Sequence, residues 1–374
     1  MDLSYYESAP TAYRFYDLAL RFIRASGVSN ILNHFKPAQG IIFALHRVRP
    51  FTKKAYQPNL SLEITPDFLD EAIAHLKLRG LKFVSLDEAL IRLSNRESGD
   101  FAVMTFDDGY YDTVEFALPV LEKHNIPATI YVVPGYADRD ISLWWVMLED
   151  AIRICSSISF HDPKGQIRFS ISTPLQKCHA FRKIHSRILE LPTHLSLPLM
   201  QNLAQQAKID GLQNSGKHCL GWSEIENLAR HPLITIGAHS LTHSLLAKCQ
   251  PSQLRDEMVR SREIIQDHIK RPVRHFSYPN GTKDNAGPRE FLMAKMLGFQ
   301  SATTVRPSLI YREHGYDPTA LPRVSLNGYF QSIKILETLM SGAPFLLKNF
   351  STSAFLQGAR RFRNPVSDAG FRLN

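Results

Sequence analysis

Short apolar runs rich in β-branched and aromatic side chains recur along the chain, and segments with helical periodicity lie between them. Seven of these runs predict strands: IIFAL (41–45), FAVMTF (101–106), ATIYVV (128–133), LITIGA (233–238), RHFSY (274–278), QSATTV (300–305) and LPRVSL (321–326). Strands that alternate with helices are typical of parallel sheets. The pattern therefore predicts an α/β fold with a mainly parallel sheet or barrel.

The segments between the strands contain helix start and stop signals. Thr65 followed by Pro66 places a capping residue before a proline at the first helical position, and Gly80 ends the same helix. Ser223 and Glu226 have the spacing of a capping box, which predicts another helix start. These signals support the alternation of strands and helices.

One connection between strands is much longer than the others. Nearly a hundred residues between ATIYVV and LITIGA show little β pattern. SLWWVMLEDAIRI (142–154) and AFRKIHSRILELP (180–192) are helical in pattern, and a polar stretch around HDPKGQIRFS (161–170) separates them. This is too long for an ordinary loop, and we expect a helical insertion over about residues 136–220.

The two ends of the chain differ from its centre. Residues 13–25 form an amphipathic pattern with Tyr13, Tyr16, Leu20 and Ile23 near one face, which favours packing on the main domain over binding to a membrane surface. The last residues form a basic tail, with five cations and one acid: Lys348, Arg360, Arg361, Arg363, Arg372 and Asp368. We expect three parts, with an N-terminal extension over 1–40, a barrel over 41–340 and the tail over 341–374.

Composition limits the classes of partner and compartment. The chain has 374 residues and a formal charge of +9, from 44 basic and 35 acidic residues, but the basic residues are scattered. Scattered charge does not indicate a nucleic-acid site. The cysteines are widely spaced and lie at Cys155, Cys178, Cys219 and Cys249. This spacing, with no signal-peptide pattern at the N-terminus, predicts reduced thiols and a cytoplasmic protein, with peripheral attachment to the inner membrane face left open.

Polar residues cluster directly after the predicted strands. They are His46, Asp107, Asp108, His239, His243, Pro279 and Asn280. Because the carboxyl ends of parallel strands open onto one face of a barrel, we expect these side chains to share that face.

The pair Asp107 and Asp108 needs an explanation, since neighbouring carboxylates repel each other. His239 and His243 are four residues apart, which on a helical turn places both imidazoles on one face. Two histidines and Asp108 would leave open positions on a metal, as catalysis requires. A dication would keep Asp108 ionised and leave Asp107 as a free base. The alternative is an ordinary Asp-Asp-Gly turn after a strand.

These motifs carry a family resemblance. TFDDGY, H-S-x-x-H and F-x-Y-P-x-G resemble, in order and spacing, the motifs of polysaccharide deacetylases, the nodulation-type deacetylases of carbohydrate esterase family four. The resemblance covers roughly residues 41–330 and implies a deformed (β/α) barrel that removes acetyl groups from sugars with a divalent metal, usually zinc. It implies that Asp108, His239 and His243 bind the metal and that Asp107 is the catalytic base.

The chain departs from the family pattern at the F-x-Y-P-x-G motif. Many members have an arginine that steadies the base, but here Ser277 stands at that position and Asn280 at that of a tyrosine. Arg323 is the candidate replacement, with an ordinary salt bridge as its alternative role. The Asn280 N–H is a candidate oxyanion donor. We also expect Arg323, Tyr278 and Pro279 to border the substrate.

The general acid has two candidates. His314 lies in a late polar loop, whereas His46 lies in ALHRV, which resembles the early Tyr-His-Arg-Val stretch of the biofilm poly-N-acetylglucosamine deacetylases. We favour His46, and a neutral core histidine is the alternative. Tyr136, Trp144 and Trp145 either form a stacking platform for sugar rings or are buried in the insertion, and the pattern favours burial.

Three functions remain open from the sequence. The first is a metal-dependent deacetylase of an acetylated oligo- or polysaccharide, such as a chito-oligosaccharide. The second is a metal amidohydrolase that cleaves a non-sugar amide, and the third is a non-catalytic sugar-binding protein. The sequence leaves open the glycan, the acetyl position, the metal and the oligomeric state.

Overall fold

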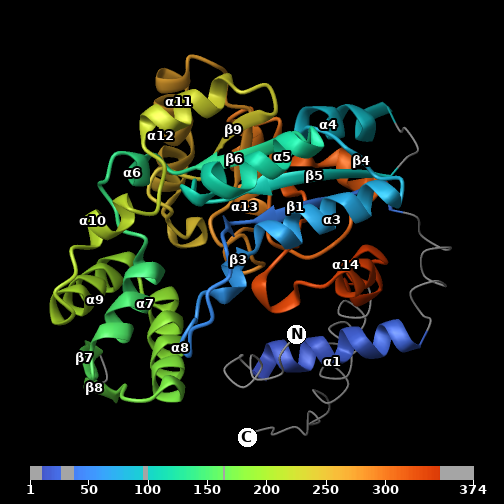
Figure 1. Cartoon of the computed structure of the whole chain (residues 1–374). Coiled ribbons are helices and arrows are strands. Elements are labelled where there is room, and N and C mark those ends of the chain that lie inside the picture. Colours follow the sequence, from blue (N-terminus) through green and yellow to red (C-terminus); the bar gives the residue numbers. More distant parts are fainter. Residues whose placement is uncertain (1–10, 27–37, 96–99, 163–164, 346–374) are drawn as a thin grey trace, which may run out of the picture.

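The computed structural model describes residues 11–26, 38–95, 100–162 and 165–345. Its centre is a curled sheet of parallel strands with helices around it (Figure 1). Along the sheet the order is β11 (Ser301–Thr303), β10 (His275–Ser277), β9 (Ile234–Ala238), β6 (Ala128–Val132), β5 (Phe101–Phe106), β1 (Gly40–Leu45) and β12 (Val324–Ser325). A parallel bridge between Thr303 and Leu321 brings the segment before β12 beside β11. The expected deformed (β/α) barrel is confirmed.

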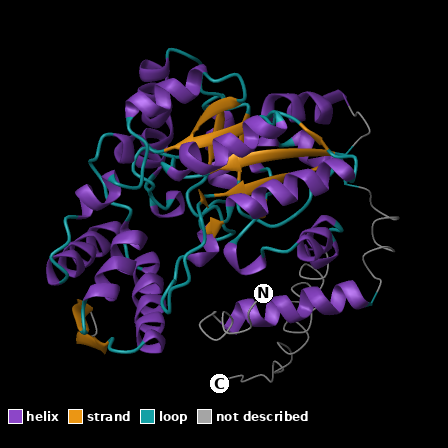
Figure 2. Cartoon of the chain, in the orientation of Figure 1, coloured by secondary structure: helices purple, strands orange, loops and turns teal. Residues whose placement is uncertain are grey.

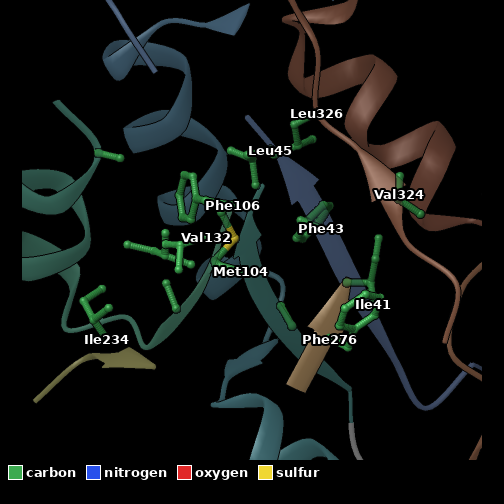
Figure 3. Close-up of a cluster of buried hydrophobic side chains, with 14 of the residues drawn as sticks. Ile41, Phe43, Leu45, Met104, Phe106, Val132, Ile234, Phe276, Val324 and Leu326 are labelled. Carbon is green, nitrogen blue, oxygen red and sulfur yellow. The ribbon is translucent and has the colours of Figure 1, made fainter. Parts of the chain in front are cut away.

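All seven predicted strands are present, and the structure adds β4 (Lys82–Phe83), a short strand that pairs with β5. Every residue of β1 and β5 is buried, so both faces of these strands are covered and their sequences are continuously apolar. In Figure 3, Phe43 of β1 and Phe106 of β5 belong to one apolar cluster. A two-residue strand such as β4 is too short to produce a recognisable pattern.

Helices cover the sheet, as Figure 2 shows. They are α3 (Pro66–Leu78), α4 (Leu86–Asn95), α5 (Leu118–His124), α11 (Trp222–Arg230), α12 (Pro251–Ile269), α13 (Pro288–Met296) and α14 (Ile333–Met340). The predicted start of α3 is confirmed, because the Phe68 N–H donates to Thr65 Oγ1 at 3.1 Å. The predicted Ser223 capping box is wrong. Helix α11 begins at Trp222 with Gly221 as its cap, two residues before the predicted cap, and Glu224 accepts from the N–H of Gly221 at 3.1 Å.

The part of the long connection that precedes α11 is helical, as predicted, and lies beside the sheet (Figure 1). Its helices are α6 (Pro134–Ala137), α7 (Trp144–Ile154), α8 (Pro174–Glu190), α9 (Thr193–Gln206) and α10 (Gly211–Gly216). The polar stretch inside it is not a loop but belongs to an antiparallel hairpin of β7 (Ser157–Asp162) and β8 (Gly165–Ser170). Ile158 and Phe160 alternate with serines and are buried, so a period of two was present in the sequence.

The N-terminal helix α1 (Thr11–Ala25) packs along α14. Leu20 and Ile23 are buried, whereas Leu18 and Phe22 are exposed. The side chains of Tyr13 and Tyr16, and the basic residues predicted for the tail, lie outside what the structure describes. Among the described helices, none is both long and apolar enough to span a bilayer.

Burial in the insertion makes one histidine sensitive to acid. Burial lowers the pKa of His185 to about 4. An unfolded histidine takes up a proton near pH 6.5, so between about pH 6.5 and 4 the unfolded chain binds more protons and acid destabilises the fold. We expect wild type to lose roughly 1–3 kcal/mol more than His185→Gln over this range. Urea unfolding of both proteins at pH 7 and pH 4.5 measures the difference, and equal losses would contradict the prediction.

Candidate active site

The adjacent carboxylates are positioned by the end of strand β5. The Asp107 N–H donates to the Leu45 carbonyl oxygen at 2.9 Å, which continues the pairing of β5 with β1. Asp108 and Gly109 then adopt left-handed backbone angles, with φ of 70° and 62°. This tight turn fixes both carboxylates in the interior, where Asp107 is 2% and Asp108 is 3% exposed.

Arg323 holds the Asp107 carboxylate with two hydrogen bonds. Nη1 donates to Asp107 Oδ1 at 2.8 Å and Nη2 donates to Oδ2 at 2.6 Å. The remaining donors are also used: Nη1 reaches Thr105 Oγ1, Nη2 reaches Ser277 Oγ, and Nε reaches the Thr304 carbonyl oxygen. All five guanidinium N–H groups therefore have partners. Ser277 stands where the family pattern has its arginine, so it now accepts a hydrogen bond from the arginine that faces the base.

The ion pair sets the charge of Asp107. Burial alone would raise the pKa of this carboxyl, but Arg323 and His239 hold the pKa below its ordinary value. Asp107 is therefore ionised at neutral pH and can accept a proton. Arg323 is 1% exposed, its donors are used internally and it does not line the cavity that Asp107 borders. The structure therefore places it behind Asp107 and not in the cavity wall, where the sequence analysis expected it.

We expect Arg323→Lys to lower kcat by about 10-fold to 100-fold with little change in KM. A lysine keeps the charge but loses the planar fork that fixes both carboxylate oxygens. Buried acceptors left without donors should also reduce the free energy of unfolding by about 1–3 kcal/mol. Arg47→Lys is a matched control, since Arg47 pairs with Asp112 in a second buried ion pair. It should lose stability and keep kcat; an equal loss of kcat in both variants would contradict the role of Arg323.

Asp108, His239 and His243 form a candidate metal site. Their potential ligand atoms all lie within 4.8 Å of one another. Asp108 Oδ1 is 3.4 Å from His239 Nε2 and 3.2 Å from His243 Nε2. His239 Nδ1 donates to the Ser277 carbonyl oxygen at 2.7 Å, so neutral His239 directs a lone pair on Nε2 towards Asp108.

The chemistry of this cluster fits a cation. Asp108 Oδ1 is buried and has no hydrogen-bond donor within the described part of the chain. Acceptor atoms this close repel one another unless a proton or a metal lies between them. The histidines hold the pKa of Asp108 well below its usual range against the effect of burial, and Asp107 and Asp108 raise the pKa of His239, also against burial. The same negative charge would attract a metal ion.

The two histidines do not lie on a helical turn, so that part of the prediction is wrong. His239 follows β9, and Ser240 and His243 both have left-handed angles, with φ of 61° and 54°. The loop is held by Glu257 of α12, which accepts from the N–H groups of Leu241 and Thr242 at 3.0 and 2.9 Å. A loop therefore brings together side chains whose spacing also suited a helix.

Glu257 was missed by the sequence analysis, although a signal was present. It is buried on α12 among residues of the apolar face, beside Leu254 and Met258. A buried acid in such a position needs partners, and here the partners belong to the histidine loop.

Two further predicted residues face the same cavity. His46 follows β1, and Asn280 has a left-handed φ of 56°; both line a cavity of about 1060 Å³ with Asp107, Asp108 and His239. Within the described ranges, the Asn280 N–H has no protein acceptor, so it is free to donate to a ligand. Burial lowers the pKa of His46, and Asp108 and Asp107 oppose this shift.

The other candidates lie elsewhere. His314 is in a short helix, Arg312–Tyr316, and does not line the cavity. Tyr278 and Pro279 are buried, and Tyr278 Oη donates to the Thr319 carbonyl oxygen at 2.8 Å. The structure therefore places neither Tyr278 nor Pro279 in the cavity wall.

The aromatic residues of the insertion are packed, as the pattern favours, and all three also line the cavity. Tyr136 and Trp145 are almost fully buried, and Trp144 is partly exposed. Trp145 Nε1 donates to Tyr110 Oη at 2.9 Å, and its ring lies 5.0 Å from that of His243. Trp145 therefore packs against His243, one of the candidate metal ligands.

A sequence model described as polysaccharide deacetylase matches residues 94–300, which is more than half of the chain. The chain belongs to the polysaccharide deacetylase family. The matched range includes the aspartate pair and both histidines of this family member. None of the curated proteins matches it.

Solved structures agree with the fold of this polysaccharide deacetylase family member. The Streptococcus pyogenes deacetylase PplD in complex with acetate is 16% identical, with a TM-score of 0.54, over 81% of this chain and 99% of that one. IcaB from Ammonifex degensii is also 16% identical, with a TM-score of 0.51, over 81% of this chain and 98% of that one. At this identity the likeness establishes the fold alone.

Proposed function

We propose that the protein hydrolyses the N-acetyl group of an acetylated amino sugar within an oligo- or polysaccharide, with a divalent metal as cofactor. One observation carries the proposal: a buried carboxylate held ionised by Arg323 lies next in sequence to a ligand of the Asp108, His239 and His243 cluster, in one cavity. This arrangement provides a base beside a candidate metal site, which hydrolysis of an amide by water requires.

The cofactor assignment follows from the donor set. Two imidazoles and one carboxylate suit zinc, although other divalent transition metals use the same ligands. A divalent cation held by these residues supplies Lewis-acid stabilisation of the acetyl carbonyl oxygen and activation of water.

The protein groups divide the remaining work. Two hydrogen bonds from Arg323 fix the orientation of the Asp107 carboxylate. The carboxylate therefore accepts the proton of the attacking water in a defined geometry. The Asn280 N–H donates to the developing oxyanion. Because burial favours neutral His46, we propose that His46 gives a proton to the departing nitrogen and that the proton Asp107 takes from the attacking water replaces it.

Acetate release from N-acetylated chito-oligosaccharides, measured with and without a chelator on protein of known metal content, tests the proposal. If acetate release stops when the chelator is added and resumes when Zn²⁺ is restored, the result supports the metal-dependent deacetylase function. Bound metal without acetate from any acetylated sugar would favour an amidohydrolase that cleaves a non-sugar amide. Absence of both metal and acetate would favour a non-catalytic sugar-binding protein.

We expect His46→Gln to lower kcat on a chito-oligosaccharide by about 100-fold, while hydrolysis of p-nitrophenyl acetate changes little. An amine must be protonated to leave, whereas p-nitrophenolate leaves without a proton. Metal content should not change. His314→Gln is the matched control and should retain the rate on both substrates. Equal losses on the two substrates would show that His46 is not the proton donor.

A further inference from the structure

The cavity continues beyond the proposed catalytic groups into the helical insertion. From Asp107 and His239 at the barrel, its wall extends to α8 and α9. Six apolar residues of these two helices line the far part: Phe181, Ile188, Leu189, Leu197, Met200 and Ala204. On α9 the lining residues are three and four positions apart, and on α8 Phe181 and Ile188 are seven apart with Leu189 next to them, so each helix presents an apolar stripe to the cavity.

The apolar lining reaches the protein surface. Leu197 is 49% exposed and Leu212, which also lines the cavity, is 44% exposed. Large apolar side chains that are left in contact with water around an opening often mark a binding site for an apolar group. Deeper in, Phe181 and Ile188 are each 5% exposed and belong to the apolar core of the insertion.

The two apolar stripes themselves offer no hydrogen-bond partners to sugar hydroxyls, so they suit a hydrocarbon better than a sugar ring. The polar residues that α8 and α9 add to the lining are Arg182, His185, Ser196 and Gln201. A hydrocarbon chain between the stripes would gain from leaving water. The volume agrees, because about 1060 Å³ is at the upper end of the roughly 300–1,000 Å³ of small-molecule sites and leaves space beyond an acetylated sugar.

The charge at this part of the cavity favours an amphiphile. Arg182 lines the cavity and is exposed. Lys248, also exposed, lines the cavity nearer the histidine loop, where its Nζ donates to the carbonyl oxygens of Leu189 and Leu191. A guanidinium beside an apolar lining suits a chain whose head carries negative charge, such as a phosphate.

We propose that the substrate is an N-acetylated sugar that carries a hydrocarbon chain, with the sugar at the catalytic end and the chain between α8 and α9. This inference rests on the proposed deacetylase function and names its substrate class. The hydrocarbon is either an acyl or alkyl chain, or a prenyl chain joined through phosphate. Both sources share the chemistry that the cavity recognises.

Acetate release from N-acetylglucosaminides with methyl, octyl and dodecyl aglycones tests chain recognition, and a prenyl-phosphate N-acetylglucosamine tests the linkage. We expect kcat/KM to rise at least tenfold from methyl to dodecyl. A further tenfold preference for the prenyl phosphate, lost in Arg182→Gln, would assign the phosphate-linked source. Equal values for dodecyl and prenyl phosphate would assign a neutral chain.

Two variants separate chain binding from general damage. Met200→Glu places a charge in the apolar stripe of α9. It should abolish the rise in kcat/KM from the methyl to the dodecyl glycoside. Leu195→Glu is the matched control on the same helix, since Leu195 is 40% exposed and does not line the cavity; it should retain the rise. Binding of the dodecyl glycoside to metal-free protein, followed by tryptophan fluorescence, gives a readout independent of turnover, because Trp144 and Trp145 line the same cavity.

The failures of the two proposals are distinguishable. If the methyl glycoside is deacetylated as efficiently as the dodecyl glycoside, the hydrocarbon site is refuted and the deacetylase function stands. If no sugar releases acetate but the dodecyl glycoside binds and Met200→Glu abolishes binding, the site stands and the deacetylase function is refuted. Binding unaffected by Met200→Glu would place the chain elsewhere and overturn the inference.

Discussion

Asp107→Asn is expected to lower kcat by about 10²–10⁴-fold while the protein keeps its metal, because an amide cannot accept the proton of the attacking water. Asp107 is not required to bind the metal, since the candidate ligands are Asp108, His239 and His243. Metal analysis of the purified variant, together with acetate release per folded molecule, separates loss of the base from loss of the cofactor.

The substitution also weakens a buried ion pair, so a control of the same kind is needed. Asp112 forms a comparable pair with Arg47, with 2.6 Å between the Arg47 Nε and Asp112 Oδ2 atoms, and it does not line the cavity. Asp112→Asn should therefore lose stability and retain its rate. Full activity in Asp107→Asn would show that another group is the base, and equal inactivity in both variants would attribute the loss to folding.

Asp108→Ala is expected to abolish turnover for a different reason, through loss of the metal. Loss of a residue that hydrogen-bonds to a metal ligand typically weakens metal binding by roughly 10–100-fold. Loss of a ligand itself should weaken metal binding by more than this. The two histidines left behind have no ligating carboxylate, since Asp107 is engaged by Arg323. Competitive titration with a chromogenic chelator measures the affinity, and turnover should not return at stoichiometric Zn²⁺.

Asp140→Ala is the matched control for this variant. Asp140 also lines the cavity but is exposed and lies outside the cluster. It should retain metal and most of the activity. If Asp108→Ala binds zinc as tightly as wild type, the metal site is assigned incorrectly.

The sequence was most informative where a residue's surroundings are simple. Strands β1 and β5 are buried on both faces, so continuous apolar runs such as IIFAL could be recognised directly. Asp107 and His46 could be placed on one face because both directly follow parallel strands. Arg323 was a candidate because the motif lacked its own arginine, and its geometry against Asp107 came only from the structure.

Features that depend on tertiary contacts could not be predicted in the same way. The spacing of His239 and His243 fits both a helical turn and a loop, and the loop is selected by Glu257, which is distant in sequence. The stripes on α8 and α9 have the same pattern whether they fill a core or line a cavity. Only the relative position of the two helices distinguishes these cases.

The pairing of Arg323 with Asp107 also has a consequence for the order in which the nascent chain matures. The ligands Asp108, His239 and His243 all precede Arg323, so they leave the ribosome first. Arg323 then joins acceptors from three earlier segments, at Thr105, Ser277 and Thr304. In the order of synthesis, the candidate metal ligands are therefore present before the guanidinium that holds Asp107. A chain that ends before Arg323 would contain all three candidate ligands and lack the side chain that fixes the Asp107 carboxylate.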